Sequence, residues 1–240
     1  MKKWTRVMYQ PNRPLKEGCY VTASKEHIAL SREAAAEGMV LLKNEHNLPL
    51  KAGSRIALFG KGSFDYVKGG GGSGDVTVSY VHNLYDGFQM LHDAVSLYEP
   101  LCDFYRANVN EQYDQGSVPG MTTEPALSAE LLAGASAYTD TAVIVLSRFS
   151  GEGWDRSSIE YNGEYNPWET ETSMPKISGE IFPDGDFYLT KEESAMIAQV
   201  KQHFSRIAVV LNIGGIIDTS WIKNDDQISS ALIAWQGGME

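Results

Sequence analysis

Glu152 is the residue of this sequence whose neighbours best suit acid–base chemistry. It has a glycine on each side, follows the apolar run 141–147, and lies between the aromatic residues Phe149 and Trp154. Aromatic rings beside a carboxyl group remove its solvation and raise its pKa, and a carboxylic acid that stays protonated near neutral pH can act as a general acid. The alternative is that Glu152 is a solvated surface acid, one of 31 acidic residues in the chain.

The residues next to Glu152 indicate how such a site would be built. Phe149 and Trp154 offer flat apolar faces, which suit sugar rings. Asp155 and Arg156 are adjacent and of opposite charge, so an ion pair between them could hold the loop in place.

The glycine-rich segment 69–74 has the G-x-G-x-x-G spacing of a dinucleotide-binding loop. It lies well beyond Gly60, where the preceding strand is expected to end, and residues 75–79 do not begin a helix. A pyrophosphate site needs the turn joined directly to a helix N-terminus. Three interpretations stay open: a phosphate site, a flexible or closely approached loop, and the wall of a pocket for another ligand.

The sequence contains neither a metal-ligand pattern nor a serine-nucleophile motif. Its 5 histidines are scattered and no two are four residues apart, and Cys19 and Cys102 form no ligand pair. No G-x-S-x-G segment occurs. We therefore expect no metal and no cofactor.

Helical patterns alternate with apolar runs along the chain, and these elements must position the candidate site. Helices are expected from Ser24 to before Asn47 and over 83–92, 98–109, 127–137 and 190–204, and buried strands over 55–60, 141–147, 206–212 and 230–235. The start of the last helix is marked by a capping box, with Thr190 at the N-cap and Glu193 three residues later.

This alternation predicts an α/β fold. We expect a three-layer sandwich, with a mostly parallel sheet of about six strands and helices on both faces. Ligands of such sheets bind outside the carboxyl ends of the strands. The loops that follow Gly60, Ser147, Asn212 and Trp235 should therefore carry the chemistry.

Charge and hydropathy exclude several classes of partner. The 20 basic and 31 acidic residues give a net charge of −11, which disfavours nucleic acids and anionic membrane surfaces. No apolar run approaches the roughly 18 residues that cross a bilayer, and no secretory signal opens the chain. We expect a cytoplasmic location, and a homo-oligomer stays open.

Four segments, taken in order, resemble glycoside hydrolase family 3, the β-glucosidase family. They are Ala34–Asn44 with Leu48-Pro-Leu50, Arg55–Gly60 with the glycine run up to Val76, Gly151–Arg156, and Ala231–Glu240. The third segment is similar to the family's Glu-Gly-x-Asp-Arg loop. The resemblance spans about residues 26–240 and points to the family's α/β sandwich domain, preceded by an irregular segment, 1–25.

The resemblance implies a retaining β-glycosidase that hydrolyses terminal β-D-glucosyl residues of a small-molecule or oligosaccharide substrate. Glu152 matches the position of the family's acid/base glutamate, and the family's nucleophile is an aspartate on a (β/α)8 barrel domain. The residues expected to contact substrate are Gly72, Ser73, Gly74, Phe149 and Trp154, and those expected to support the loop are Asp155 and Arg156.

The chain departs from the family pattern because it contains no barrel sequence and therefore no nucleophile. Its start at Met1, ahead of the sandwich, resembles the subgroup with reversed domain order, so we expect the missing barrel domain to follow in the same polypeptide. The loop 157–186 is longer than the family's usual loop. Two other functions stay open: a non-catalytic carbohydrate-binding or interaction domain, and a small nucleotide-binding protein.

Overall fold

The computed structural model describes residues 15–20, 24–76, 78, 80–152, 156–160 and 174–239. The chain divides into two compact units, residues 1–38 with 240, and residues 39–239. The first unit contains the antiparallel pair β1 (Leu15–Lys16) and β2 (Cys19–Tyr20), followed by the helix α2 (Lys25–Gly38). Ser24 Oγ accepts a hydrogen bond from the backbone N–H of His27, which confirms the predicted helix start. The domain boundary at residue 25 stays a prediction.

The second unit is built on a six-stranded sheet with the strand order β3-β8-β7-β6-β4-β5. All neighbouring pairs are parallel except β3 and β8, so the predicted fold class is confirmed. The strands are β3 (Val40–Asn44), β4 (Ser54–Phe59), β5 (Val95–Leu97), β6 (Thr141–Arg148), β7 (Arg206–Ile213) and β8 (Ile228–Ile233).

The core lies on both faces of the central strands. Every residue of β6 is buried, which fits the apolar and β-branched residues over 141–146. Ile144 and Leu146 belong to the cluster on one face, and Val143 and Val145 belong to the cluster on the other.

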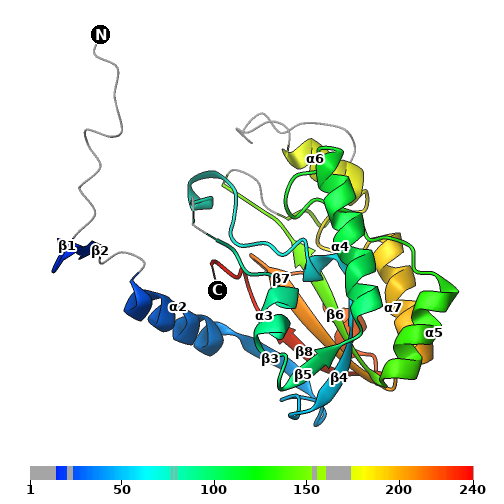
Figure 1. Cartoon of the computed structure of the whole chain (residues 1–240). Coiled ribbons are helices and arrows are strands. Elements are labelled where there is room, and N and C mark those ends of the chain that lie inside the picture. Colours follow the sequence, from blue (N-terminus) through cyan, green and yellow to red (C-terminus); the bar gives the residue numbers. More distant parts are fainter. Residues whose placement is uncertain are drawn as a thin grey trace. The chain divides into compact units, whose positions relative to one another are not determined.

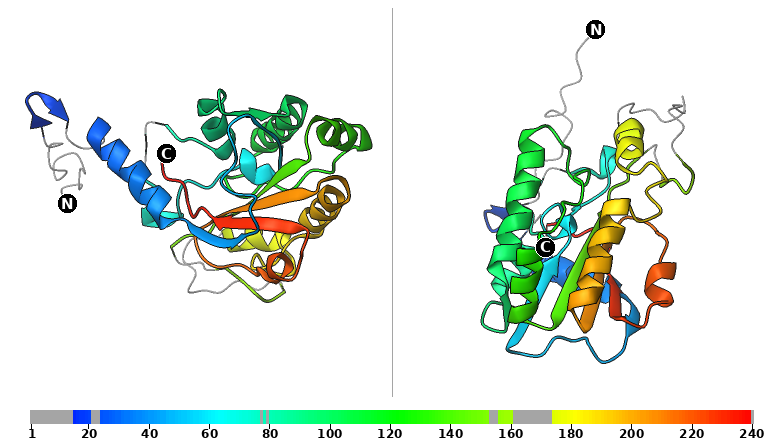
Figure 2. Two further views of the ribbon diagram at one scale, coloured as in Figure 1. Left: turned by 90° about the horizontal axis from the view of Figure 1, so that it is seen from below. Right: turned by 90° about the vertical axis from the view of Figure 1, so that its right-hand side faces the viewer.

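Helices cover both of these faces (Figures 1 and 2). Side chains of α5 and α7 pack in the larger cluster, and side chains of α3 pack against the smaller one. The helices of this unit are α3 (Leu84–Met90), α4 (Glu99–Asp114), α5 (Ala129–Tyr138), α6 (Met174–Ile181), α7 (Lys191–His203) and the short α8 (Ser220–Lys223). Within the described ranges, no helix is long and apolar enough to span a bilayer.

The predicted capping box of α7 is present. The Thr190 side chain accepts from the backbone N–H of Glu193, whose carboxylate accepts from the backbone N–H of Thr190. Ser128 caps α5 in a similar way, because its hydroxyl accepts from the backbone N–H of Leu131.

Several elements differ from the sequence-based expectation, among them the pair β1–β2 in the segment expected to be irregular, and α8, which was not predicted. The helix predicted to reach Asn47 ends at Gly38, and residues 40–44 pair antiparallel with β8 instead. Cross-strand pairing with β8 is a long-range interaction that the local helical spacing does not contain. The three-residue strand β5 and the helix α6 were not predicted, and both are short.

Candidate functional site

A cavity of about 540 Å³ opens at the carboxyl ends of β4 and β6. Most of its wall comes from the segment after β4 and from the connection between α4 and α5. The residues that line it are Tyr66, Val67, Lys68, Gly69, Gly71, Gly72, Asp75, Val81, Val118, Pro119, Phe149 and Glu152. Two of the four loops expected to carry the chemistry, those after Gly60 and Ser147, thus form this cavity.

Glu152 lies at the edge of this cavity with an exposed carboxylate. Its Oε2 atom accepts a hydrogen bond of 2.5 Å from the Ser73 hydroxyl and one of 2.8 Å from the Ser73 backbone N–H. Its backbone N–H donates to Gly71 O at 3.3 Å, and the backbone N–H of Gly71 donates to Ser150 O at 3.1 Å. The glycine-rich segment and the Glu152 loop are therefore joined by main-chain and side-chain bonds.

This junction requires glycine at position 72. Gly72 has φ of +72°, and a Cβ atom there would lie 2.5 Å from the Glu152 Cβ and 2.8 Å from Oε2. The segment 72–74 forms a single 3-10 turn, η2 (Gly72–Gly74). Of the three interpretations of the glycine run, the structure favours close approach and the wall of a pocket over a phosphate site, because no α-helix begins at the run.

With Glu152 in the acid–base role that the family resemblance implies, we expect Gly72→Ala to lower the activity of the complete enzyme by about 10²-fold, because displacing a catalytic group by about 1 Å can have an effect of that size. The added methyl group must push the turn and the Glu152 side chain apart. Gly87→Ala is the matched control, since a Cβ at Gly87 in α3 meets no atom within 4 Å. Steady-state kinetics of both variants checks the prediction. Equal activities would contradict the close packing of Gly72 against Glu152.

Phe149 forms the back of the same wall. Its ring lies 3.3 Å from the position of a Cβ built on Gly71, and its Cβ atom lies 2.6 Å from one built on Gly120, which has φ of +83°. Phe149 also packs against Met121 and Phe182. The structure therefore places Phe149 at the cavity, as the sequence predicted, although part of its surface is used in packing.

The pKa expectation for Glu152 is wrong for the described residues. The hydroxyl and then the backbone N–H of Ser73 lower the pKa of the Glu152 carboxyl, and the opposing effect of burial is smaller. The side chain is exposed rather than enclosed by rings, so desolvation does not dominate.

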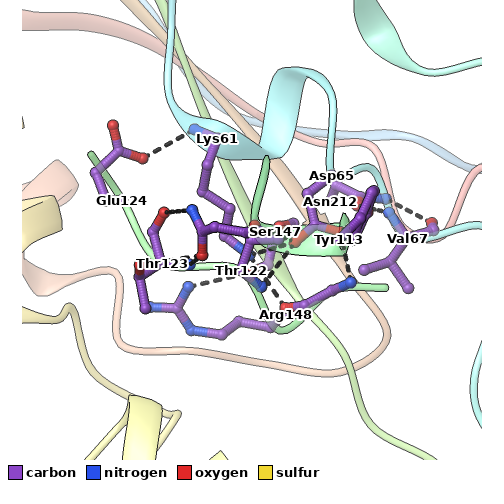
Figure 3. Close-up of polar contacts among 12 residues, drawn as sticks. Lys61, Asp65, Val67, Tyr113, Thr122, Thr123, Glu124, Ser147, Arg148 and Asn212 are labelled. Carbon is purple, nitrogen blue, oxygen red and sulfur yellow. Dashed lines mark hydrogen bonds and ion pairs between the residues drawn. The ribbon is translucent and has the colours of Figure 1, made fainter. Parts of the chain in front are cut away.

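A buried polar network holds residues next to the cavity wall in place (Figure 3). Lys61 Nζ lies 2.9 Å from Asp65 Oδ2 and donates to Gly120 O at 3.0 Å. Asp65 also accepts hydrogen bonds from Tyr113, Thr122 and the backbone of Gly120. Burial would raise the pKa of Asp65, but Lys61 and these hydrogen bonds lower it to about 2. The ion pair thus fixes Gly120, against which Phe149 packs.

A second buried ion pair fixes the strand end that leads to Glu152. Arg148, the last residue of β6, donates to both carboxylate oxygens of Glu193, at 2.7 and 2.6 Å. Its other donors bind the carbonyl oxygens of Ser147, Asp186 and Tyr188. Burial would raise the pKa of Glu193, but Arg148 lowers it. All donor and acceptor groups of this pair are thereby used.

Neither ion pair was predicted from the sequence to be part of the site. For the first pair, the available signal was that Lys61 and Asp65 are four residues apart and follow a buried strand. For the second pair, it was the charged residue Arg148 at the end of an otherwise apolar strand. The sequence identified Glu193 only as part of the helix cap, because its ion-pair partner Arg148 is 45 residues away in the sequence.

Of the two loop-support residues, the structure describes Arg156. It lies 4.0 Å from Asp186, and burial lowers its pKa to about 10. The predicted ion pair between Arg156 and Asp155 stays a prediction. Trp154 and Asp155 lie outside the described residues. Gly72, Ser73 and Gly74 form one turn beside Glu152. In the part of the chain that the structure describes, no group of His, Cys, Asp and Glu side chains could hold a metal ion.

Curated proteins similar to this chain are β-glucosidases. β-Glucosidase A of Butyrivibrio fibrisolvens is 54% identical over an alignment that covers 100% of this chain and 29% of the relative. A β-glucosidase of Ruminococcus albus is 31% identical, with 89% of this chain and 20% of the relative covered. The chain therefore spans less than a third of the length of either protein.

Solved structures give the same result. A β-glucosidase of Paenibacillus barengoltzii superimposes with a TM-score of 0.71 at 31% identity, covering 90% of this chain and 22% of that one. β-Glucosidase 3B of Thermotoga neapolitana, solved with glucose, gives a TM-score of 0.71 at 29% identity, covering 93% and 28%. The family model for the glycosyl hydrolase family 3 C-terminal domain matches residues 39–240, and the chain therefore belongs to this family.

Proposed function

We propose that this chain is the acid–base domain of a retaining β-glucosidase that acts on terminal β-D-glucosyl residues. The observation that carries the proposal is the placement of Glu152. Its carboxylate is held by Ser73 at the rim of a cavity, at the carboxyl end of β6, and is open to an incoming group. Relatives that share this domain are named β-glucosidases. A barrel domain of the same polypeptide would supply the nucleophile and complete the enzyme.

The reaction in the complete enzyme would take two steps. In the first, the nucleophilic aspartate attacks the anomeric carbon, and Glu152 gives its proton to the glycosidic oxygen as the bond to that oxygen breaks. In the second, Glu152 takes a proton from water as the water oxygen displaces the aspartate. Retention of configuration requires the two carboxyl groups to lie about 5–5.5 Å apart. The exposure of Glu152 in this domain agrees with a partner carboxylate on another domain.

The cavity supports a role in holding the leaving group of the substrate. Its wall includes the rings of Tyr66 and Phe149 and the apolar side chains of Val81 and Val118. Lys68 and Asp75 add charge at its edge, but they pair with each other at 2.6 Å. We propose that the glucosyl unit lies towards the barrel domain and that an apolar or flat aglycone lies in this cavity.

The test compares the complete enzyme with this chain alone. We expect the complete enzyme to release β-glucose first from an aryl β-D-glucoside, as followed by proton NMR of the anomeric signals. This chain alone should not hydrolyse the substrate, because it carries one of the two carboxyl groups. First release of α-glucose would exclude retention. Tight binding of glucose or cellobiose by this chain alone, with an inactive complete protein, would favour the non-catalytic carbohydrate-binding domain.

A further inference from the structure

The two oxygens of the Glu152 carboxylate have different surroundings. Oε2 accepts both hydrogen bonds from Ser73, one from the hydroxyl at 2.5 Å and one from the backbone N–H at 2.8 Å. Among the residues that the structure describes, no donor is assigned to Oε1. The carboxylate is therefore held at one oxygen and open at the other.

The backbone around Ser73 keeps this asymmetry in place. Gly71 and Gly151 form a parallel bridge, in which Gly71 O accepts from the backbone N–H of Glu152. The turn η2 brings Ser73 next to the carboxylate, and the bare Cα of Gly72 allows the close approach. Lys68 Nζ donates to Asp75 and to Val76 O, which closes the base of the glycine-rich loop. Ser73 is thus held next to Glu152 by the main-chain bridge on one side and by the Lys68 side chain on the other.

We propose that Ser73 is a positioning residue for Glu152, and that by binding Oε2 it leaves Oε1 as the atom that gives and takes the proton. This inference rests on the acid–base role proposed above. Both Ser73 donors bind Oε2, and the backbone N–H cannot accept, so a proton on Oε2 would weaken the bond from that N–H, whereas a proton on Oε1 leaves both bonds in place. The proton is then carried by Oε1.

The proton balance follows from this assignment. In the first step an oxygen of the nucleophilic aspartate forms a bond to C1, and the electron pair of the glycosidic C1–O bond leaves with the glycosidic oxygen. The Oε1–H bond breaks and its proton goes to that oxygen. In the second step the water oxygen forms a bond to C1, its proton goes to Oε1, and the bond from C1 to the nucleophilic aspartate breaks. Ser73 transfers no proton in either step, and its two bonds to Oε2 strengthen when Glu152 becomes ionised.

Of the described residues, the other two charged ones that line the cavity offset one another. Lys68 and Asp75 line the same cavity and form an ion pair, and Tyr66 lines its far wall. Of the described residues, Ser73 supplies both hydrogen bonds that lower the pKa of Glu152. Removing the Ser73 hydroxyl should therefore raise that pKa, while the backbone N–H still donates.

The test is the pH dependence of kcat/KM in the complete enzyme carrying Ser73→Ala or Ser73→Thr. A general acid must be protonated for the first step, so kcat/KM falls as pH rises through its pKa. We expect Ser73→Ala to move this alkaline limb to higher pH and to lower kcat on cellobiose by about tenfold, the loss of one hydrogen bond to a charged group. Ser73→Thr keeps the hydroxyl, so its alkaline limb and its kcat should both match those of the wild type. Ser136→Ala, in α5, removes an exposed hydroxyl that donates to Ala133 O and serves as the control.

Two results would overturn the inference. An unchanged alkaline limb in Ser73→Ala, with a raised KM alone, would mean that Ser73 contacts the sugar and does not act through Glu152. Failure of Ser73→Thr to restore the limb would mean that the hydroxyl is not the relevant group. If Glu152→Ala itself leaves activity on cellobiose unchanged, the proposed function fails, which is distinct from a failure confined to Ser73.

Discussion

Glu152→Ala in the complete enzyme is expected to lower kcat/KM for cellobiose by about 10²–10⁴-fold, the usual contribution of general acid catalysis. The first step then lacks a proton donor, and glucose is a poor leaving group without one. In an activated aryl glucoside the leaving group is a strongly acidic phenol, which departs as the anion and needs little protonation. Its kcat/KM should therefore change far less. A plot of log(kcat/KM) against the pKa of the leaving group measures this difference.

The control for this variant is Glu160→Ala. Glu160 is an exposed glutamate a short distance further along the same loop, and it should give the wild-type plot. Equal slowing of cellobiose and of activated aryl glucosides by Glu152→Ala would count against an acid role. Such a result would place Glu152 among residues that bind the sugar or stabilise the domain.

Glu193→Ala is expected to lower the free energy of unfolding by about 3–5 kcal/mol, the range for removal of one partner from a buried ion pair. In the intact pair, the side chains of Arg148 and Glu193 are 1% and 3% exposed. The variant would leave the Arg148 guanidinium buried with two of its donors unpaired. The variant also removes the acceptor for the backbone N–H of Thr190, so α7 loses part of its cap. Urea denaturation followed by circular dichroism measures the change.

Glu192→Ala provides a matched control on the same helix. Glu192 is exposed and follows Lys191 in the first turn of α7, so its loss should change the free energy of unfolding by less than about 0.5 kcal/mol. Similar unfolding midpoints for the two variants would mean that the Arg148–Glu193 pair does not stabilise the fold. The account predicts a clear separation between them.

The parts of the fold that the sequence predicted are those with strong local signals. The central strands β4, β6, β7 and β8 are continuous apolar runs, and the ends of α5 and α7 are marked by Ser128 and Thr190. The strand β3 was predicted as helix because its residues continue an apolar pattern that begins in α2. Its pairing with β8 joins Val40 to Ile233, which is a tertiary contact that no local pattern contains.

The candidate site was predicted in part. The sequence identified Glu152 and the glycine-rich segment, but not the hydrogen bonds that join Ser73 to Glu152. It also missed Lys61 with Asp65, because a lysine in a glycine-rich stretch looks solvent-exposed until the fold buries it. The expectation of an elevated pKa for Glu152 failed because its side chain is exposed and accepts two hydrogen bonds from Ser73, which lower the pKa.

The exposure of Glu152 has a consequence for the complete enzyme. Ser73 favours the ionised form of Glu152, which suits the base that we propose Glu152 to be in the second step. The first step needs the protonated form. A nucleophilic carboxylate about 5–5.5 Å away would raise the pKa of Glu152 by like-charge repulsion, and its conversion to an ester in the first step would remove that effect. Domain assembly and Ser73 would thus act on Glu152 in opposite directions.

The most direct test of the acid–base role is azide rescue of Glu152→Ala in the complete enzyme, with an activated aryl β-D-glucoside as substrate. Azide needs no base to attack the glucosyl-enzyme intermediate. The account predicts that azide increases turnover and that the product is β-D-glucosyl azide, identified by the coupling constant of its anomeric proton. An α-glucosyl azide would assign Glu152 as the nucleophile instead, and the absence of any rescue in an otherwise folded variant would contradict the account.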